Sequence, residues 1–367
     1  MKKLLFILGT RPEAIKLSAP VLCFRRSPQD FEVQVCLTGQ HRELARQALA
    51  SFGIAADFDL DLMLPGQTLF QSTSRILSAL EAVFATTRPD LVFVQGDTTT
   101  TLCGALGAFY AGIPVAHIEA GLRTWDLARP FPEEANRQLV SKLATLHLAA
   151  TAGAAANLQR EGIDEQSISV TGNTGIDALL LMADRLPPVA WKFLDPTRKM
   201  LLVTGHRRAN FGDGIERFCQ ALRRLATRQD LQIVYPVHPN PNVRTPVESL
   251  LSGLDSVHLI APQDYPPFVD LMRRSYLILT DSGGVQEEGP SLGKPILVTR
   301  EVTERPEAVE AGTVRLVGTD EDKIVAEAEL LLDDEAEYAR RSRIHNPYGD
   351  GHASPRIEQA VRSYFAL

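Results

Sequence analysis

The feature that most constrains the fold is a repeated alternation of short apolar segments with longer segments of helical period. Twelve apolar segments rich in β-branched residues fall into two sets, at residues 3–8, 32–37, 91–95, 114–118, 146–150 and 167–171, and at 199–204, 231–236, 257–260, 276–280, 295–298 and 314–317. Continuous apolar strands separated by helices are typical of parallel sheets covered on both faces. We therefore predict an α/β protein with two doubly wound, Rossmann-like domains.

A proline-rich stretch separates the two sets of predicted strands. Residues 186–196 contain three prolines and interrupt the alternation. We predict a first domain at 1–185, a linker at 186–198 and a second domain at 199–352. The segment 353–367 has a helical pattern and is expected to pack back on the first domain. A chain of 367 residues is also long enough that two domains are the default expectation.

Composition excludes several classes of partner. The net charge of −7 argues against a nucleic-acid-binding surface, and no apolar run reaches the roughly 20 residues of a membrane span. The N-terminal apolar run is too short for a secretory signal, because Arg11 and Glu13 follow it at once. The four cysteines are widely spaced, which is typical of reduced thiols. We therefore expect a cytoplasmic protein with no nucleic-acid or membrane partner.

Polar residues follow the predicted strands of the first domain. Arg11 and Lys16 lie near the start of a helix, where two cations are unfavourable without an anion, so phosphate binding is favoured over a solvated surface. Asp97 follows the strand at 91–95 and is either the cap of the next helix or free for other work, because Thr98 could cap that helix equally well.

Two further carboxylates follow in the same domain. Glu119 ends an apolar strand, a costly place for a carboxylate unless it is solvated, used or paired, for example with Arg123. Glu133 opens a predicted helix and could simply pair with Arg137 one turn later. Carboxylates that converge at one sheet edge would favour acid–base chemistry.

The second domain carries an anion-binding pattern. Ser282, Gly283 and Gly284 end an apolar strand and open a helix, an arrangement that either presents main-chain N–H groups to a diphosphate or is an ordinary tight turn. Glu288 is well placed to hold ribose hydroxyls. His206, with two arginine neighbours after another strand, favours anion contact. No spacing of His, Cys or Asp predicts a metal site, and none predicts an acyl-transfer nucleophile.

Eight motifs occur together and in order. They are GTRPEAIK at 9–16, QGDT at 95–98, HIEAGLRT at 117–124, PEEANR at 132–137, TGHRR at 204–208, PVHPN at 236–240, DSGGVQEE at 281–288 and TERPE at 303–307. Over essentially its whole length the chain resembles the non-hydrolysing UDP-N-acetylglucosamine 2-epimerases. The resemblance implies a GT-B fold with a central cleft, usually a homodimer. It also implies reversible conversion of UDP-N-acetylglucosamine to UDP-N-acetylmannosamine without a metal or nicotinamide cofactor.

The resemblance also implies roles for individual residues. Asp97, Glu119 and Glu133 match the acid–base carboxylates of the family, and Arg137 and His206 match residues near the reacting sugar and diphosphate. The UDP-binding set is implied at Arg11, Lys16, His206, Ser282, Gly283, Gly284, Glu288 and Arg305. Bacterial members often bind a second UDP-N-acetylglucosamine as an allosteric activator, with contacts that would map to Gln40, Gln67, Glu134, Arg207 and His238. Gly66 stands where several bacterial members have arginine.

Four alternative functions stay open on the sequence alone. The chain could epimerise a related UDP sugar, such as a diacetamido-uronate. It could be a GT-B glycosyltransferase, although three clustered carboxylates argue against that. A non-catalytic UDP-sugar sensor would bind without turnover, and a hydrolysing epimerase would release free UDP.

Overall fold

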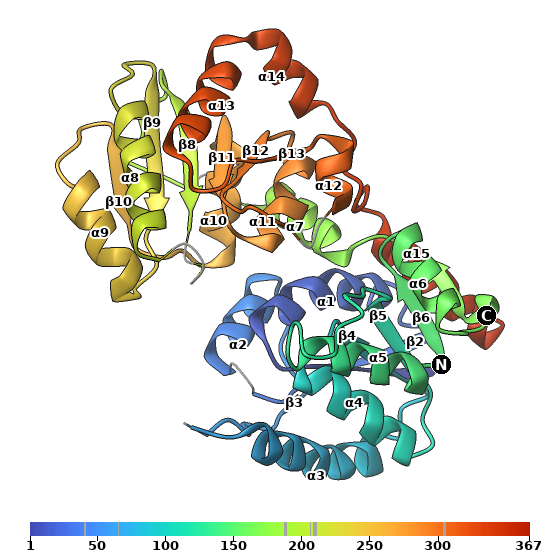
Figure 1. The fold of residues 1–367 in the computed structure, drawn as a ribbon. Coiled ribbons are helices and arrows are strands. Elements are labelled where there is room, and N and C mark those ends of the chain that lie inside the picture. The colour runs from blue at the N-terminus through green and yellow to red at the C-terminus, as the bar shows by residue number, and fades with distance from the viewer. Residues whose placement is uncertain (40–41, 65, 187–188, 206, 208–210, 304–305) are drawn as a thin grey trace. The chain divides into compact units, whose positions relative to one another are not determined.

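The computed structural model describes residues 1–39, 42–64, 66–186, 189–205, 207, 211–303 and 306–367. The chain forms two compact units. One consists of Met1–Leu181 with Gly349–Leu367, and the other is Met182–Tyr348 (Figure 1). Each unit contains one parallel sheet flanked by helices, so the predicted α/β class with two doubly wound domains is confirmed. No helix in the described part of the chain has both the length and the apolar character that a membrane span requires.

The described residues of the first unit form a seven-stranded sheet in the order β3-β2-β1-β4-β5-β6-β7. Its strands are β1 (Lys2–Leu8), β2 (Phe31–Leu37), β3 (Phe58–Asp59), β4 (Leu91–Gln95), β5 (Val115–Ala120), β6 (Leu146–Ala149) and β7 (Ile168–Val170). Its helices are α1 (Arg11–Phe24), α2 (Arg42–Ser51), α3 (Leu69–Thr87), α4 (Thr99–Tyr110), α5 (Glu133–Leu143), α6 (Ala152–Arg160), the first part of α7 (Thr174–Arg185), and α15 (Ala353–Phe365). A short 3₁₀ helix, η1, spans Glu165–Ser167.

The first core forms because its strands are apolar on both faces. All five residues of β4 are buried, and Phe6 of β1 stacks on Phe93 with ring centroids 4.3 Å apart. Phe24 of α1 contacts both rings. Burial of large aromatic side chains at the centre of the sheet provides much of the driving force for folding.

The described residues of the second unit form a six-stranded sheet in the order β10-β9-β8-β11-β12-β13. Its strands are β8 (Lys199–Thr204), β9 (Leu231–Pro236), β10 (Val257–Ile260), β11 (Leu277–Thr280), β12 (Ile296–Val298) and β13 (Val314–Leu316). Its helices are α8 (Asp213–Leu225), α9 (Pro241–Leu251), α10 (Tyr265–Arg274), α11 (Gly283–Glu288), the 3₁₀ helix η3 (Gly289–Leu292), α12 (Pro306–Ala311), α13 (Glu321–Asp333) and α14 (Glu335–Ser342).

The C-terminal helix α15 belongs to the first unit. It packs on α1, where Glu358 accepts hydrogen bonds from Ser27 and from the thiol of Cys23, both at 3.2 Å. Asp177 of α7 accepts the main-chain N–H groups of Ala353 and Ser354 at 3.1 and 2.7 Å. These bonds satisfy two donors at the helix start that have no partner within α15.

Candidate functional site

The order of the first sheet creates a switch point beside β1. The chain runs from β1 to β2 on one side and later returns to place β4 on the other side. Ligands of open α/β sheets bind beyond the carboxyl ends of the strands at such a point. In this unit, the residues there include Lys16 on α1, Asp97 after β4 and Glu119 on β5.

Asp97 lies beside the cation of Arg137. The guanidinium Nη2 is 3.1 Å from Oδ2 of Asp97. Thr98, not Asp97, caps α4, because the Thr98 hydroxyl accepts the N–H of Thr101 at 3.1 Å. The capping alternative for Asp97 is therefore wrong, and its carboxylate is available for other contacts.

The surroundings of Asp97 bring its pKa close to neutrality. The pKa of Asp97 is raised to about 6, mainly by burial. The cations of Arg137 and Lys16 act to lower this pKa, and the carboxylates of Glu119 and Glu133 act to raise it. The structure thus gathers three carboxylates and two cations within electrostatic reach of one another. A carboxyl group with a pKa near working pH can both accept and deliver a proton.

Glu119 is held in an unusual main-chain conformation. Its φ is +64°, and the pairing of β5 with β6 shifts register between Ile118 and Ala120. Such a bulge re-aims a side chain at a cost in local strain. The carboxylate lies 2.5 Å from Nζ of Lys16 and accepts the amide of Gln95 at 2.8 Å.

Two ion pairs that the sequence suggested are not formed among the described residues. Arg123 binds Glu161 with two hydrogen bonds of 2.8 and 2.7 Å, so the pairing of Arg123 with Glu119 is wrong. The salt bridges of Arg137 join its guanidinium to Asp97 and Glu134, and its Nε also donates to the main-chain carbonyl of Glu133. The carboxylate of Glu133 is therefore not neutralised by the predicted helical pair.

Glu134 has a structural role that the sequence did not reveal. Its side chain is completely buried and accepts the N–H groups of Thr124 and Trp125 at 3.0 and 3.2 Å. It also accepts the side-chain amide of Gln138 at 2.7 Å. These bonds join the segment after β5 to α5, so that Glu134 orders the main chain near Glu119 and Glu133.

Glu13 is a second buried carboxylate beside the site. It accepts the N–H groups of Gly9 and Thr10, at 3.1 and 2.7 Å, and the hydroxyl groups of Thr10, Thr98 and Thr101, at 2.7, 2.7 and 3.2 Å. Burial raises the pKa of Glu13, and these hydrogen bonds lower it. The sequence signal for this residue is the capping box formed by Thr10 and Glu13.

The second sheet has its own switch point at β8, between β9 and β11. The hydroxyl groups of Thr204 and Thr280 lie 2.5 Å apart at the ends of β8 and β11, and Thr280 also accepts the N–H of Ser282 at 2.9 Å. Asp281 is buried and accepts the main-chain N–H of Arg207 at 2.8 Å. These bonds shape the turn from β11 into α11.

The turn into α11 leaves room above Gly284. Gly284 is exposed, and a Cβ built there would have only the Ser282 hydroxyl within 4 Å, at 3.9 Å. Glu288 is half-buried at the end of α11 and accepts the hydroxyl of Tyr265 at 3.3 Å. A small cavity lies at the same end of the sheet, next to Gly205, Phe211 and Asp281.

The remaining predicted site residues are distributed over both units. Arg11 begins α1 and is half-buried, and the Gln67 amide donates to the carbonyl of Leu62 at 3.1 Å. His238 is exposed after β9, where its Nδ1 accepts the N–H of Asn240 at 3.1 Å. The predictions at Gln40, His206 and Arg305 lie outside the described residues. Within the described ranges, no three His, Cys, Asp or Glu residues are grouped as metal ligands.

Comparisons with known proteins agree along almost the whole chain. A family model described as UDP-N-acetylglucosamine 2-epimerase matches residues 24–362. UDP-N-acetylglucosamine 2-epimerase of Salmonella typhimurium is 55% identical over 372 residues, covering 99% of each chain, and that of Escherichia coli K12 is 54% identical, covering 98% of each.

Solved structures extend the similarity to the fold. The Neisseria meningitidis UDP-GlcNAc 2-epimerase bound to UDP-GlcNAc is 46% identical with a TM-score of 0.89, covering 98% of this chain and all of that one. The Methanocaldococcus jannaschii enzyme, in complex with UDP-GlcNAc and UDP, is 33% identical with a TM-score of 0.79, covering 99% of each chain.

Proposed function

The chain belongs to the UDP-N-acetylglucosamine 2-epimerase family, and we propose that it interconverts UDP-N-acetylglucosamine and UDP-N-acetylmannosamine by proton transfer at carbon 2 of the sugar. The observation that carries this proposal is the cluster of Asp97, Glu119 and Glu133 with Lys16 and Arg137. Burial, together with the two nearby carboxylates, raises the pKa of Asp97 to about 6, within the range that acid–base catalysis uses.

The proposed reaction has two balanced halves. A carboxylate removes the proton from carbon 2, the electron pair forms the carbon–carbon double bond, and the bond from carbon 1 to the diphosphate oxygen breaks to release UDP. The intermediate, 2-acetamidoglucal, stays bound. UDP then re-forms its bond to carbon 1 as a carboxylic acid delivers a proton to the opposite face of carbon 2. Asp97, Glu119 and Glu133 supply the acid–base groups, and Arg137 and His206 act beside the sugar and diphosphate.

The leaving diphosphate needs strong stabilisation, because a proton on carbon 2 is only weakly acidic. We assign its binding to the main-chain N–H groups of Ser282, Gly283 and Gly284, and to the cations of Arg11, Lys16 and Arg305, with His206. Glu288 holds the ribose. This assignment of the diphosphate site is supported by the open space above Gly284 and by the position of α11 at the switch point of the second sheet.

Regulation by a second UDP-N-acetylglucosamine is part of the proposal. Its contacts are assigned to Gln40, Gln67, Arg207 and His238. Glu134, which the resemblance also implied, is completely buried and its carboxylate accepts three hydrogen bonds within the first unit, so we do not assign it to this ligand. An allosteric activator predicts a sigmoidal forward rate curve and a reverse reaction that needs added UDP-N-acetylglucosamine. A hyperbolic curve and an independent reverse reaction would contradict it.

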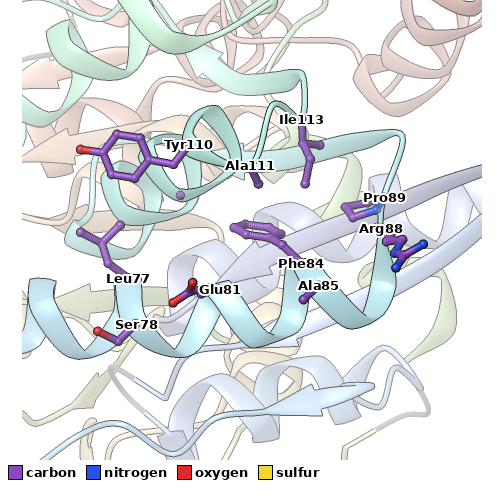
Figure 2. Close-up of a pocket in the computed structure, with 11 residues that line it drawn as sticks. Leu77, Ser78, Glu81, Phe84, Ala85, Arg88, Pro89, Tyr110, Ala111 and Ile113 are labelled. Atoms are coloured by element: carbon purple, nitrogen blue, oxygen red, sulfur yellow. The ribbon is translucent and has the colours of Figure 1, made fainter.

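A homodimer is proposed because α3, α4 and α5, which pack in sequence, expose large apolar side chains. Phe70 is 89% exposed on α3, Phe109 and Tyr110 are 58% and 73% exposed on α4, and Leu139 is 54% exposed on α5. A groove lies between α3 and α4, and Tyr110 is one of its lining residues (Figure 2). Exposed apolar patches of this kind are typical of protein interfaces.

We also propose a cytoplasmic location, which is supported by the four free cysteines, three of them buried.

Proton NMR of the purified protein with UDP-N-acetylglucosamine in D₂O tests the function directly. We expect a manno product and deuterium at carbon 2 of both epimers. Deuterium without a manno product would indicate a related UDP sugar as the substrate. An unchanged spectrum with UDP-N-acetylglucosamine and with related UDP sugars would overturn epimerisation, and transfer to an added acceptor would then establish a glycosyltransferase.

A further inference from the structure

The segment around Asp97 is held by three side chains from three different elements, two of which bind its main chain and one the side chain of Thr98. His117 of β5 lies 2.7 Å from the carbonyl oxygen of Gly96, and Asn136 of α5 donates its amide to the carbonyl of Asp97 at 2.8 Å. Glu13 of α1 accepts the hydroxyl of Thr98 at 2.7 Å. The three consecutive residues 96–98 are therefore each tied to a separate part of the first unit.

These three side chains are buried, and their partners are the carbonyl oxygens of Gly96 and Asp97 and the hydroxyl of Thr98. His117, Asn136 and Glu13 are each at most 5% exposed. Burial lowers the pKa of His117 to about 3, so its imidazole is neutral, and Nε2 carries the proton because a carbonyl can only accept. Buried hydrogen bonds of this kind are costly to break, since the group left behind keeps no partner.

Each element that supplies a tether also supplies a charged neighbour of Asp97. Helix α1 carries Glu13 and Lys16, β5 carries His117 and Glu119, and α5 carries Asn136 together with Glu133 and Arg137. The tethers consequently set the distances from Asp97 to all four of these charged groups. Arg137 forms a salt bridge with Asp97, with 3.1 Å between Nη2 and Oδ2.

We propose that Asn136, His117 and Glu13 are positioning residues that hold Asp97 at its working distance from Lys16, Glu119, Glu133 and Arg137. This inference rests on the proposed function for its effect on turnover. Small displacements matter in such a site, because a misplacement of about 1 Å can lower a rate by roughly 100-fold.

The first test replaces Asn136 by leucine, which removes the amide donor while keeping a side chain of similar size. We expect kcat to fall about 10- to 100-fold with little change in KM. Because the Asp97 main chain can then move away from α5, the effect of Arg137 weakens and the pKa of Asp97 rises above about 6. Asn157→Leu is the matched control, since Asn157 of α6 donates its amide to the main-chain carbonyl of Gly121 and not to residues 96–98.

The second test separates the hydrogen bond from the volume of the side chain. His117→Gln can retain an N–H donor toward Gly96, whereas His117→Leu cannot. We expect His117→Gln to keep most of the turnover that His117→Leu loses. Unfolding curves for both variants exclude loss of folded protein as the cause.

Two readouts distinguish failure of this inference from failure of the proposed function. Carbon-13 NMR of the aspartate carboxyl groups, with Asp97→Asn for assignment, follows the pKa of Asp97 without any substrate. A raised pKa in Asn136→Leu but not in Asn157→Leu supports the positioning role even if the natural substrate differs. An unchanged Asp97 pKa in Asn136→Leu, or equal turnover in His117→Gln and His117→Leu, overturns it.

Discussion

The raised pKa of Asp97 suits proton transfer, but it should lower the free energy of unfolding at neutral pH. An acid whose pKa is higher in the folded than in the unfolded chain binds its proton more tightly when folded. The unfolded chain loses this proton near pH 4, and the folded chain keeps it until about pH 6. The stability contribution of this group is therefore present at low pH and is lost as pH rises through that window.

Asp97→Asn should accordingly stabilise the protein at neutral pH. We expect its free energy of unfolding at pH 7.5 to exceed that of the wild type by up to about 3 kcal/mol, and the difference to shrink at pH 4. Asp350→Asn is the control with the opposite sign, because Arg356 holds the pKa of Asp350 well below its usual range. Urea titrations at both pH values measure this, and an Asp97→Asn protein less stable than wild type at pH 7.5 would contradict the account.

The same carboxylates should control turnover. We expect Asp97→Asn, Glu119→Gln and Glu133→Gln each to lower kcat by roughly 100-fold or more, on the scale of general acid–base catalysis. Rates measured by NMR at a saturating concentration of UDP-N-acetylglucosamine test this. Near-normal turnover in all three variants would show that the chemistry lies elsewhere.

The sequence could predict the individual carboxylates but not most of their partners. Asp97 and Glu119 stand out because each follows an apolar strand, whereas the partner of Glu119, Lys16, is 103 residues away in the chain. Local spacing suggested an ion pair between Arg123 and Glu119, and that interpretation was wrong because Arg123 pairs with Glu161 instead. Contacts between distant segments depend on how the strands are ordered in the sheet, and side-chain spacing does not encode that order.

At the scale of elements, the strand predictions succeeded wherever an apolar run was long enough. All twelve predicted strands appear within two residues of their predicted bounds, and the helical pattern at the C-terminus forms α15. The sequence did not predict β3, because its two residues, Phe58 and Asp59, are too few to show a period. The bulge at Glu119 was also missed, since a positive φ at a glutamate has no compositional signal.

A substitution in the turn from β11 into α11 should change the affinity for UDP without changing the stability of the free protein. We expect Gly284→Leu to weaken UDP binding at least tenfold, because its side chain would occupy the open space assigned to the diphosphate. The stability of the free protein should change by no more than about 0.5 kcal/mol, as for other exposed positions. Calorimetric titration with UDP and denaturation without it measure the two effects.

Gly289 provides the contrast for this experiment. A Cβ at Gly289 would lie 2.4 Å from Cδ1 of Ile296, so Gly289→Leu should destabilise the protein even without UDP. If Gly284→Leu binds UDP as tightly as the wild type, the diphosphate does not lie above this turn.

The start of α15 should contribute measurably to the stability of the first unit. Asp177→Ala leaves the N–H groups of Ala353 and Ser354 without their partner, and we expect the free energy of unfolding to fall by about 1–3 kcal/mol. Glu248→Ala breaks only an exposed pair with Arg244 and should cost less than about 1 kcal/mol. Equal losses in the two variants, measured by urea denaturation, would indicate that α15 is held by its apolar contacts alone.

At the scale of the whole molecule, the proposed homodimer accounts for the apolar surface of the first unit. The side chains that line the groove between α3 and α4 come from the carboxyl-terminal parts of these helices, which lead into the starts of β4 and β5. Asp97 and Glu119 lie at the opposite ends of these strands. An interface centred on this groove would therefore leave the switch point of the first sheet accessible to a nucleotide sugar.

A charge placed on this surface should dissociate the dimer without unfolding the chain. We expect light scattering to give twice the 40.3 kDa chain mass for the wild type and once that mass for Phe109→Glu with Tyr110→Glu. Both side chains are already exposed within one chain, so the substitutions remove apolar contact only between chains, where burial contributes about 25 cal/mol per Å². Tyr364→Glu, at an exposed position of α15, should remain dimeric. A monomeric wild type at micromolar concentration, or a double variant that stays dimeric, would require a different explanation for the exposed face of α4.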